Sequence, residues 1–264
     1  MTSFNYHSPA AAGEAVNAAT GSDDKRYLAG GMSLIPSIKQ RLLEPTDLIS
    51  LDGIADLAGI RQDGNNIVIG AMTTHAEVAA SELVKSTIPA LADLANDIGD
   101  PQVRNRGTIG GSIANADPAA DYPAAVLGLN ATITTHSRSI AADDFFTDLF
   151  ETALADGELV TSVSFPIADS AAYEKFDNPA SRYAIVGVMV ARTGGGVRVA
   201  VTGAGAIVFR VAEMESALAG SFNSDSVTSV VIDATDLNDD IHASSEYRAS
   251  LVPLMAGRAV ASIV

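Results

Sequence analysis

The chain has 264 residues, with 32 Asp and Glu against 16 Lys and Arg, so its formal net charge at pH 7 is −16. This acidic excess argues against nucleic acid or an anionic membrane surface as a partner. The chain contains no cysteine, which excludes disulfides, thiolate nucleophiles, zinc–thiolate sites and iron–sulfur ligation within it.

Hydrophobic residues make up 47% of the chain, enough for a substantial core. No apolar run approaches the roughly 20 residues of a membrane-spanning helix, and the first residues lack the pattern of a secretion signal. We therefore expect a folded protein with no membrane span, located in the cytoplasm. The histidines are too scattered along the sequence to indicate a metal centre; they are His7, His75, His136 and His242.

Short apolar runs that end at glycine or polar residues predict strands in the first half of the chain. These runs occupy residues 26–30, 47–51, 66–71 and 131–136. Capping residues, the Ser8-Pro9 pair and apolar residues repeated at i, i+3, i+4 and i+7 predict helices between them. These helices occupy residues 10–19, 34–42, 72–81, 88–98 and 122–131.

The composition changes at residues 165–182, which are polar and rich in turn residues, and we expect this segment to connect two domains. Beyond it, apolar runs at 183–192 and 197–205 flank the turn 193-TGGG-196 and predict an antiparallel hairpin. Helices are expected at 210–220 and within 243–264. Strands and helices mix without strict alternation, which favours an α+β fold.

Adjacent glycines occur in two similar loops, AGGMS at 29–33 and TIGGS at 108–112. Glycine adopts positive φ and lets a ligand approach the main chain, and converging amides can bind an anion. Ser33 could cap the following helix or bond a phosphate oxygen. One such loop alone is usually a turn. Two loops of this kind indicate a diphosphate held between two subdomains, chiefly by the main chain because cationic side chains are scarce.

The segment 203-GAGAIV-208 follows an expected strand and begins like a dinucleotide-binding fingerprint. Val208 stands where the third glycine would be, so we read Gly203 and Gly205 as turn or close-packing residues. No GxxxxGK[ST] phosphate loop occurs in the sequence.

Two aspartates follow the second glycine loop. Asp117 precedes a proline and fits an Asx turn. Asp121 could either cap the helix that starts at Tyr122 or accept hydrogen bonds from ligand hydroxyls such as those of a ribityl chain.

Several segments, in unbroken order along residues 3–260, resemble the FAD-binding medium subunit of molybdenum hydroxylases. This family includes carbon monoxide dehydrogenase medium chains and is related to the flavin domain of xanthine dehydrogenase. The segments are AGGMSLIPSIKQRL, IGAMTTHAEV, DPQVRNRGTIGGSIANADPAADYPA, YAIVGV and DIHASSEYRASL. The resemblance implies a two-subdomain FAD-binding domain of the PCMH type, at 1–54 and 55–168. A C-terminal flavoprotein domain, an antiparallel sheet with helices, would follow at 169–264.

The resemblance also implies which residues bind FAD. The diphosphate-binding segments of the family correspond to Ala29, Gly30, Gly31, Met32, Ser33, Leu34 and Ile35, and to Thr108, Gly110, Gly111 and Ser112. Near the rest of the cofactor the family places His75, Asp121, Lys175 and Tyr183, with Leu159 and Val160 as apolar contacts. Met32 and Ser112 occupy variable motif positions, which other members fill with polar or charged residues. We predict that aspartate at both Gly31 and Gly110 removes FAD from a folded protein.

The resemblance finally implies a heterotrimer, present as a dimer of heterotrimers. A large subunit would carry molybdopterin and oxidise the substrate, a small subunit would carry two two-iron two-sulfur clusters, and this chain would carry FAD as the electron exit. The absence of cysteine and of any evident nucleophile–base pair agrees with this, so we expect no catalytic residue here. Two alternatives stay open: a self-contained flavin-dependent oxidase or dehydrogenase of a small organic substrate, and a non-enzymatic assembly module.

Overall fold

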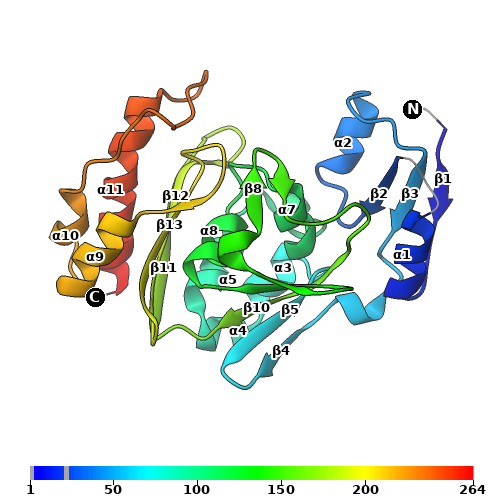
Figure 1. Ribbon diagram of the computed structural model, residues 1–264, viewed down its shortest axis with the longest axis horizontal. Coiled ribbons are helices and arrows are strands. Elements are labelled where there is room, and N and C mark those ends of the chain that lie inside the picture. Colours follow the sequence, from blue (N-terminus) through cyan, green and yellow to red (C-terminus); the bar gives the residue numbers. More distant parts are fainter. Residues whose placement is uncertain (1–2, 21–23, 264) are drawn as a thin grey trace.

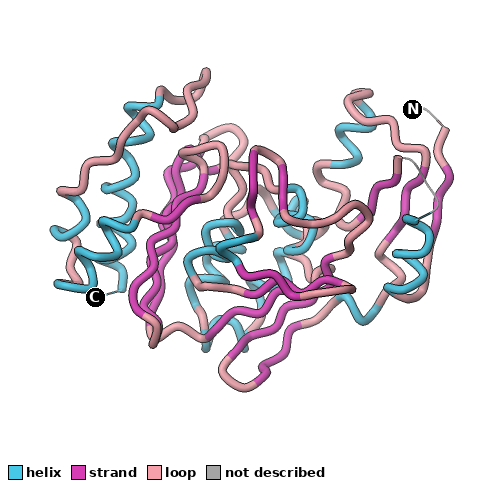
Figure 2. The backbone as a smooth tube through the Cα atoms, in the orientation of Figure 1, coloured by secondary structure: helices cyan, strands magenta, loops and turns pink. Residues whose placement is uncertain are grey.

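The computed structural model describes residues 3–20 and 24–263. In this part, the chain forms three sheets of three or more strands, each with its helices, and a separate two-stranded hairpin. The N-terminal part lies near one end of the molecule and the C-terminal helices near the other, with the middle of the chain between them (Figures 1 and 2). The separate parallel and antiparallel sheets confirm the predicted α+β class.

The N-terminal part builds a parallel sheet with strand order β1-β3-β2. Its elements are β1 (Asn5–His7), α1 (Ala12–Thr20), β2 (Lys25–Leu28), α2 (Leu34–Lys39) and β3 (Asp47–Ser50). The helix predicted at residues 10–19 from the Ser8-Pro9 pair begins two residues later, at Ala12. Leu159, from much later in the chain, packs with Ala15 and Ile49 in the core of this part.

The middle of the chain forms an antiparallel sheet with strand order β4-β5-β10-β6-β7. Its strands are β4 (Ile60–Asp63), β5 (Asn66–Gly70), β6 (Thr132–Thr135), β7 (Ser139–Ala141) and β10 (Val160–Pro166), and β8 (Phe146–Asp148) pairs with β9 (Glu151–Thr152). Its helices are η1 (Ala55–Leu57), α3 (His75–Ala80), α4 (Glu82–Thr87), α5 (Pro89–Asn96), α6 (Pro101–Arg104), α7 (Ile109–Asn115), α8 (Tyr122–Gly128) and η2 (Ala142–Asp144).

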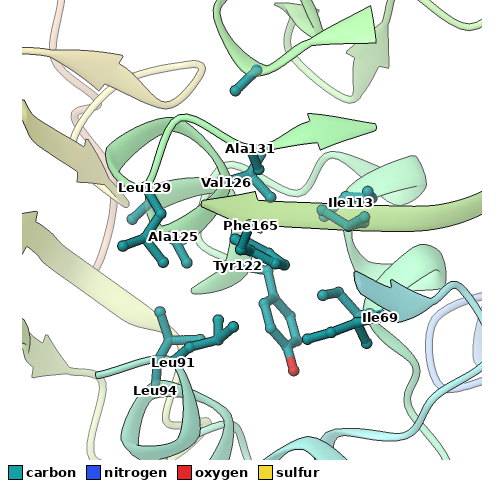
Figure 3. Packing of buried hydrophobic residues seen from close by; sticks show 14 of the residues in the cluster. Ile69, Leu91, Leu94, Ile113, Tyr122, Ala125, Val126, Leu129, Ala131 and Phe165 are labelled. Atoms are coloured by element: carbon teal, nitrogen blue, oxygen red, sulfur yellow. The ribbon is translucent and has the colours of Figure 1, made fainter. Parts of the chain in front are cut away.

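Tyr122, the first residue of α8, is the largest fully buried side chain of the middle core. Figure 3 shows its ring among Ile69 of β5, Leu91 of α5 and Phe165 of β10. Its hydroxyl has no hydrogen-bond partner in the described part of the chain, and burial raises the pKa of this group. The start of α8, and with it Asp121, is therefore fixed by the core.

The C-terminal part forms an antiparallel sheet with strand order β11-β12-β13-β14, and helices cover one of its faces. Its elements are β11 (Ser170–Asp177), β12 (Ala184–Thr193), β13 (Gly196–Thr202), β14 (Phe209–Arg210), α9 (Ala212–Gly220), α10 (Asp225–Thr228) and α11 (Ser245–Ile263). The expected hairpin is β12–β13. A Cβ on Gly203 would lie 2.6 Å from the carbonyl oxygen of Ala184, which confirms Gly203 as a close-packing residue.

The prediction that residues 165–182 only connect two domains is wrong, because residues 170–177 form the strand β11 and pair with β12 throughout. Its polar side chains do not mark a loop, since each face of the strand meets a different core. Ala172 and Phe176 pack with the C-terminal helices, whereas Tyr173 packs against the middle core. Lys175, on the same face as Tyr173, is paired with carboxylates.

The remaining helix and strand predictions match elements of the structure within a few residues, except that the last segment holds one helix, α11, where several were expected. The elements that were not predicted from the sequence are β1, β4, β7, β10, β14, α4, α6, α7, α10, the β8–β9 hairpin and the short helices η1 and η2. Among the helices described, none is long and apolar enough to cross a bilayer.

Candidate functional site

The two glycine loops lie against each other, although they belong to different sheets. A Cβ on Gly30 would lie 2.1 Å from the carbonyl oxygen of Arg106 and 2.8 Å from the Cα of Gly107. A Cβ on Gly111 would lie 3.5 Å from the Cβ of Ala29. A side chain at position 30 would therefore separate the loops, which is a physical reason for glycine there.

The first loop, Ala29–Ser33, leaves the carboxyl end of β2 with unpaired amides. Within residues 3–20 and 24–263, no amide from Gly30 to Ser33 donates to another protein group. Gly31 has a φ of +73°, and its carbonyl accepts the first bond of α2, from the Ile35 amide at 3.0 Å. The Ser33 hydroxyl makes no cap bond, so the capping interpretation of Ser33 is wrong. This loop can bind an anion with several N–H groups.

In the second loop, the amides from Ile109 to Ser112 all have protein acceptors, so its role in FAD binding stays a prediction. The Ile109 amide donates to Thr73 at 3.1 Å, that of Gly110 to Ala71 at 2.9 Å, and that of Ser112 to the Thr108 carbonyl at 2.9 Å. The Gly111 amide donates to the Thr108 hydroxyl at 3.1 Å, a cap that starts α7. In this loop the Ser112 side chain makes no hydrogen bond to the described residues, so its hydroxyl is available to a ligand.

Gly110 serves a packing role. Its Cβ would lie 2.5 Å from the Cβ and 2.7 Å from the carbonyl oxygen of Ala71, so only glycine lets α7 approach the end of β5 so closely. The Gly110→Asp half of the predicted double variant would disrupt this packing and is a poor test of ligand binding.

Asp121 lies at the centre of a buried polar cluster. Its Oδ1 accepts a hydrogen bond from the Tyr173 hydroxyl at 2.6 Å and pairs with Lys175 Nζ at 3.1 Å. It makes no cap bond to α8, so the capping interpretation of Asp121 is wrong. Burial raises the pKa of this carboxyl to about 6, against the opposing effects of Lys175 and Tyr173. The group can therefore change its charge near neutral pH.

Lys175 is fully engaged by the protein. Its side chain is 2% exposed, and Nζ donates to the carbonyl oxygens of Asp97 at 2.8 Å and Arg182 at 3.0 Å. Its charge also pairs with the Asp97 carboxylate at 3.1 Å. Because these contacts use its donors, the lysine holds β11 against the end of α5 and balances the charge of Asp121.

Tyr183, just before β12, lies near Asp117 and Asp121. Burial and then the charges of these two carboxylates raise the pKa of its hydroxyl. Its side chain is still 45% exposed, so part of the ring can contact a ligand. The Asp117 carboxylate accepts a hydrogen bond from the Ala119 amide at 2.9 Å, which confirms the Asx turn.

His75, at the start of α3, lies behind the second loop. A Cβ on Gly107 would be 2.5 Å from its Nε2, and its ring centroid is 5.3 Å from that of Tyr122. Burial, with a smaller effect of Arg104, lowers its pKa to about 4, so the imidazole is neutral at pH 7. Its Nδ1 has no partner in the described part of the chain. The contacts show that His75 supports the loop.

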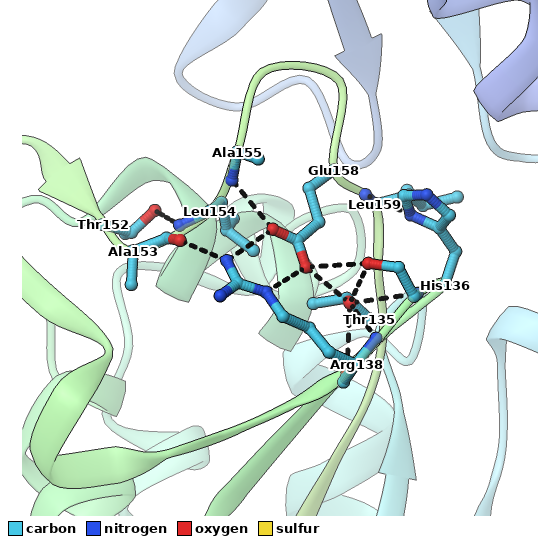
Figure 4. Close-up of polar contacts among 10 residues, drawn as sticks. Thr135, His136, Arg138, Thr152, Ala153, Leu154, Ala155, Glu158 and Leu159 are labelled. Carbon is cyan, nitrogen blue, oxygen red and sulfur yellow. Dashed lines mark hydrogen bonds and ion pairs between the residues drawn. The ribbon is translucent and has the colours of Figure 1, made fainter.

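Leu159 and Val160 are both buried, but they pack into different cores, the N-terminal and the middle one. The Leu159 amide donates to His136 Nδ1 at 3.1 Å. Beside them, Glu158 accepts hydrogen bonds from Arg138 Nε at 2.9 Å, the Thr135 hydroxyl at 2.7 Å and the Ala155 amide at 2.8 Å (Figure 4). Nothing in the sequence pointed to this network. Arg138 holds the pKa of Glu158 well below its usual range.

A cleft of about 380 Å³ lies between α1 and this network rather than between the glycine loops. Lys25 and Asp156, which form an ion pair, and Arg138 and Glu158 are among its lining residues. The carboxylate of Glu158 is saturated by protein donors, so we assign the cleft a structural role. Nor do the described residues contain a group of three or more His, Asp or Glu side chains placed to bind a metal ion.

A model of the family described as the FAD binding domain in molybdopterin dehydrogenase matches residues 2–168. The chain belongs to this family. The family membership confirms the recognition made from the five sequence segments, and it assigns the chain to the FAD-binding oxidoreductase subunits. The unpaired amides of the first loop fit a diphosphate, but the individual FAD contacts stay predictions.

Relatives with similar sequences cover nearly the whole chain. It is 36% identical to the glyceraldehyde dehydrogenase medium chain of Sulfolobus acidocaldarius, over 94% of this chain and 91% of the relative. It is 34% identical to the carbon monoxide dehydrogenase medium chain of Hydrogenophaga pseudoflava, over 97% of this chain and 96% of the relative. A chain in the crystal structure of the cyanide-inactivated Cu,Mo-CO dehydrogenase superposes on this chain with a TM-score of 0.90 and 32% identity. The match covers 99% of this chain and 98% of that chain. The family match and these relatives agree on a flavin-binding medium chain.

Proposed function

We propose that this chain is the FAD-carrying electron-transfer subunit of a heterotrimeric molybdenum hydroxylase. Its partners would be a large molybdopterin subunit and a small iron–sulfur subunit, assembled as a dimer of heterotrimers. Electrons would pass from the clusters of the small subunit through this chain to an external acceptor. The observation that supports this best is the first glycine loop, whose unpaired amides lie against the second loop in a chain of this family.

The residues of this chain would bind and orient the cofactor. The amides of Gly30 to Ser33 would donate to its diphosphate, together with the hydroxyls of Ser33 and Ser112. Asp121 and the exposed part of Tyr183 would contact the flavin side. FAD supplies, when bound, the capacity to store two electrons received singly. No residue here needs to move a proton on the organic substrate.

The relatives named above are medium chains of dehydrogenases of glyceraldehyde and carbon monoxide. Because similar medium chains belong to such different reactions, we propose that the large subunit selects the substrate. Subdomains at 1–54 and 55–168, a flavoprotein domain at 169–264 and a cytoplasmic location are parts of the same proposal. Cell fractionation of the native organism tests the location.

The test is reduction of the reconstituted chain. We expect the purified chain to bind FAD and to show flavin absorption. We expect the flavin band to bleach when the reduced small subunit is added, and to stay unchanged with aldehydes or N-heteroaromatic compounds alone. Bleaching by such a compound without partners would support the self-contained oxidase. A chain that binds no flavin would support the assembly module.

A further inference from the structure

The diphosphate of FAD is anionic, and the chain that would bind it carries a net charge of −16. Amides provide only partial positive charges, so a full cation near the first loop would improve binding. Two arginines precede the second loop, Arg104 and Arg106. Nη1 of Arg104 donates to the carbonyl oxygens of Ile98 at 3.0 Å and Gly99 at 3.1 Å, so this side chain is committed to the fold.

Arg106 lies directly against the loop of unpaired amides. Its carbonyl oxygen is the atom 2.1 Å from the position of a Cβ on Gly30. Its side chain is 57% exposed, and among the described residues its guanidinium forms an ion pair of 3.7 Å with Asp52 Oδ2. This distance exceeds that of a hydrogen bond, so the guanidinium donors are available to a ligand.

Asp52 shows where the guanidinium points. It follows β3, which runs parallel to β2 with Leu28 opposite Ser50, and the Leu51 amide donates to the Leu28 carbonyl at 3.0 Å. Asp52 and the first loop therefore leave the sheet at the same edge, the carboxyl edge at which parallel sheets bind ligands. The Arg106 guanidinium, held by Asp52, lies at this edge too.

We propose that Arg106 is a diphosphate-binding residue, and that Asp52 holds its guanidinium at the carboxyl edge of β2 and β3 until the ligand arrives. On binding, the guanidinium exchanges the solvent-exposed carboxylate for phosphate oxygens, which its planar fork can bind with two parallel hydrogen bonds. The inference rests on the proposed function for the identity of the ligand.

The test compares FAD with riboflavin, which lacks the diphosphate. The full-length chain is freed of cofactor and titrated with each compound at several salt concentrations, with flavin fluorescence as the readout. We expect Arg106→Gln to weaken FAD binding about 10- to 100-fold, the range for hydrogen bonds to charged groups. We expect riboflavin affinity to be unchanged and the salt dependence of FAD affinity to decrease.

Two variants serve as controls. Arg61→Gln removes the same charge from an exposed position on β4, and FAD affinity should stay at the wild-type value. Asp52→Asn removes the competing carboxylate and should strengthen FAD binding a few-fold. Equal losses for FAD and riboflavin in Arg106→Gln, or an unchanged FAD affinity, would overturn the role of Arg106. If the wild-type chain binds neither compound, the proposed function fails as well, and this result is distinct from a failure confined to the variant.

Discussion

The two glycine loops look alike in sequence but use their glycines differently. In AGGMS, Gly31 has positive φ, Gly30 lets the loops meet, and the amides stay unpaired. In TIGGS, the amides from Ile109 to Ser112 all have protein acceptors, and Gly110 packs on Ala71. The first loop is free at the end of a parallel strand, whereas the second is docked against residues 71–74. A repeated motif therefore does not imply that the main-chain amides of both loops have the same partners.

The largest effect is expected at the contact between the loops. Gly30→Ala would place a Cβ 2.1 Å from a main-chain oxygen, and the loops would have to separate. We expect FAD affinity to fall by a factor on the order of 100 or more, since loss of several charge-assisted hydrogen bonds costs this much. Titration by flavin fluorescence measures it. Gly13→Ala in α1, with nothing within 4 Å, is the matched control and should bind FAD normally.

The packing behind the second loop should make the stability of the protein depend on pH, because the buried His75 supports this loop and, among the described residues, no buried histidine lies behind the first loop. The pKa of His75 is lowered to about 4 in the folded protein by burial, against an ordinary value of 6.5. The unfolded chain therefore binds the proton more tightly, and acidification from pH 6.5 to 4 lowers the free energy of unfolding, by about 2–3 kcal/mol. In urea unfolding of His75→Gln, the free energy of unfolding should lack this acid-dependent loss.

Asp121 titrates in the same window with the opposite sign, since its raised pKa of about 6 means that the folded state binds the proton more tightly. At each pH, the free energy of unfolding of His75→Gln is therefore subtracted from that of the wild type, and this difference is compared between pH values. A difference that does not change between pH 6.5 and 4 would contradict the burial of a neutral imidazole.

Gly110→Ala should reduce stability more than it alters binding. The added methyl group would overlap Ala71, and overpacking of a core typically costs about 1–3 kcal/mol. We expect the free energy of unfolding in urea to fall by this amount, while the folded fraction keeps FAD affinity within a few-fold. Loss of FAD binding without loss of stability would show that Gly110 contributes to ligand binding, as proposed for the first loop, and not to packing.

The smallest effect is expected for the serine of the free loop. Ser33→Ala removes a hydroxyl that makes no cap bond, so stability should stay within about 0.5 kcal/mol. One lost hydrogen bond to the ligand should weaken FAD binding about 3- to 10-fold. Calorimetric titration measures the affinity, and unchanged binding would exclude the Ser33 hydroxyl from the site.

Local patterns predicted much of the fold, because β5, α5 and the β12–β13 hairpin follow simple periodicities and turn signals. They failed at β11, since Tyr173 and Lys175 are stabilised there by Asp121, which is distant in sequence. They also failed at α7, where two glycines disfavour a helix that the Thr108 cap and the contact with Ala71 stabilise.

The candidate site was predicted in part. The motifs identified both loops, but nothing in the sequence distinguishes amides that are free from amides paired with residues 71 and 73. Arg106 could have been noticed as a cation beside the motif. Its exposure and its approach to Asp52 depend on the meeting of two sheets, which only the structure shows.

The central claim is that the amides of the first loop bind the diphosphate. NMR spectra of the chain labelled with ¹⁵N-glycine, recorded with and without FAD, test it most directly. We expect large chemical-shift changes and slower hydrogen exchange at the amides of Gly30 and Gly31, with smaller changes at Gly110 and Gly111. Large changes at Gly110 and Gly111 with none at Gly30 and Gly31 would contradict it.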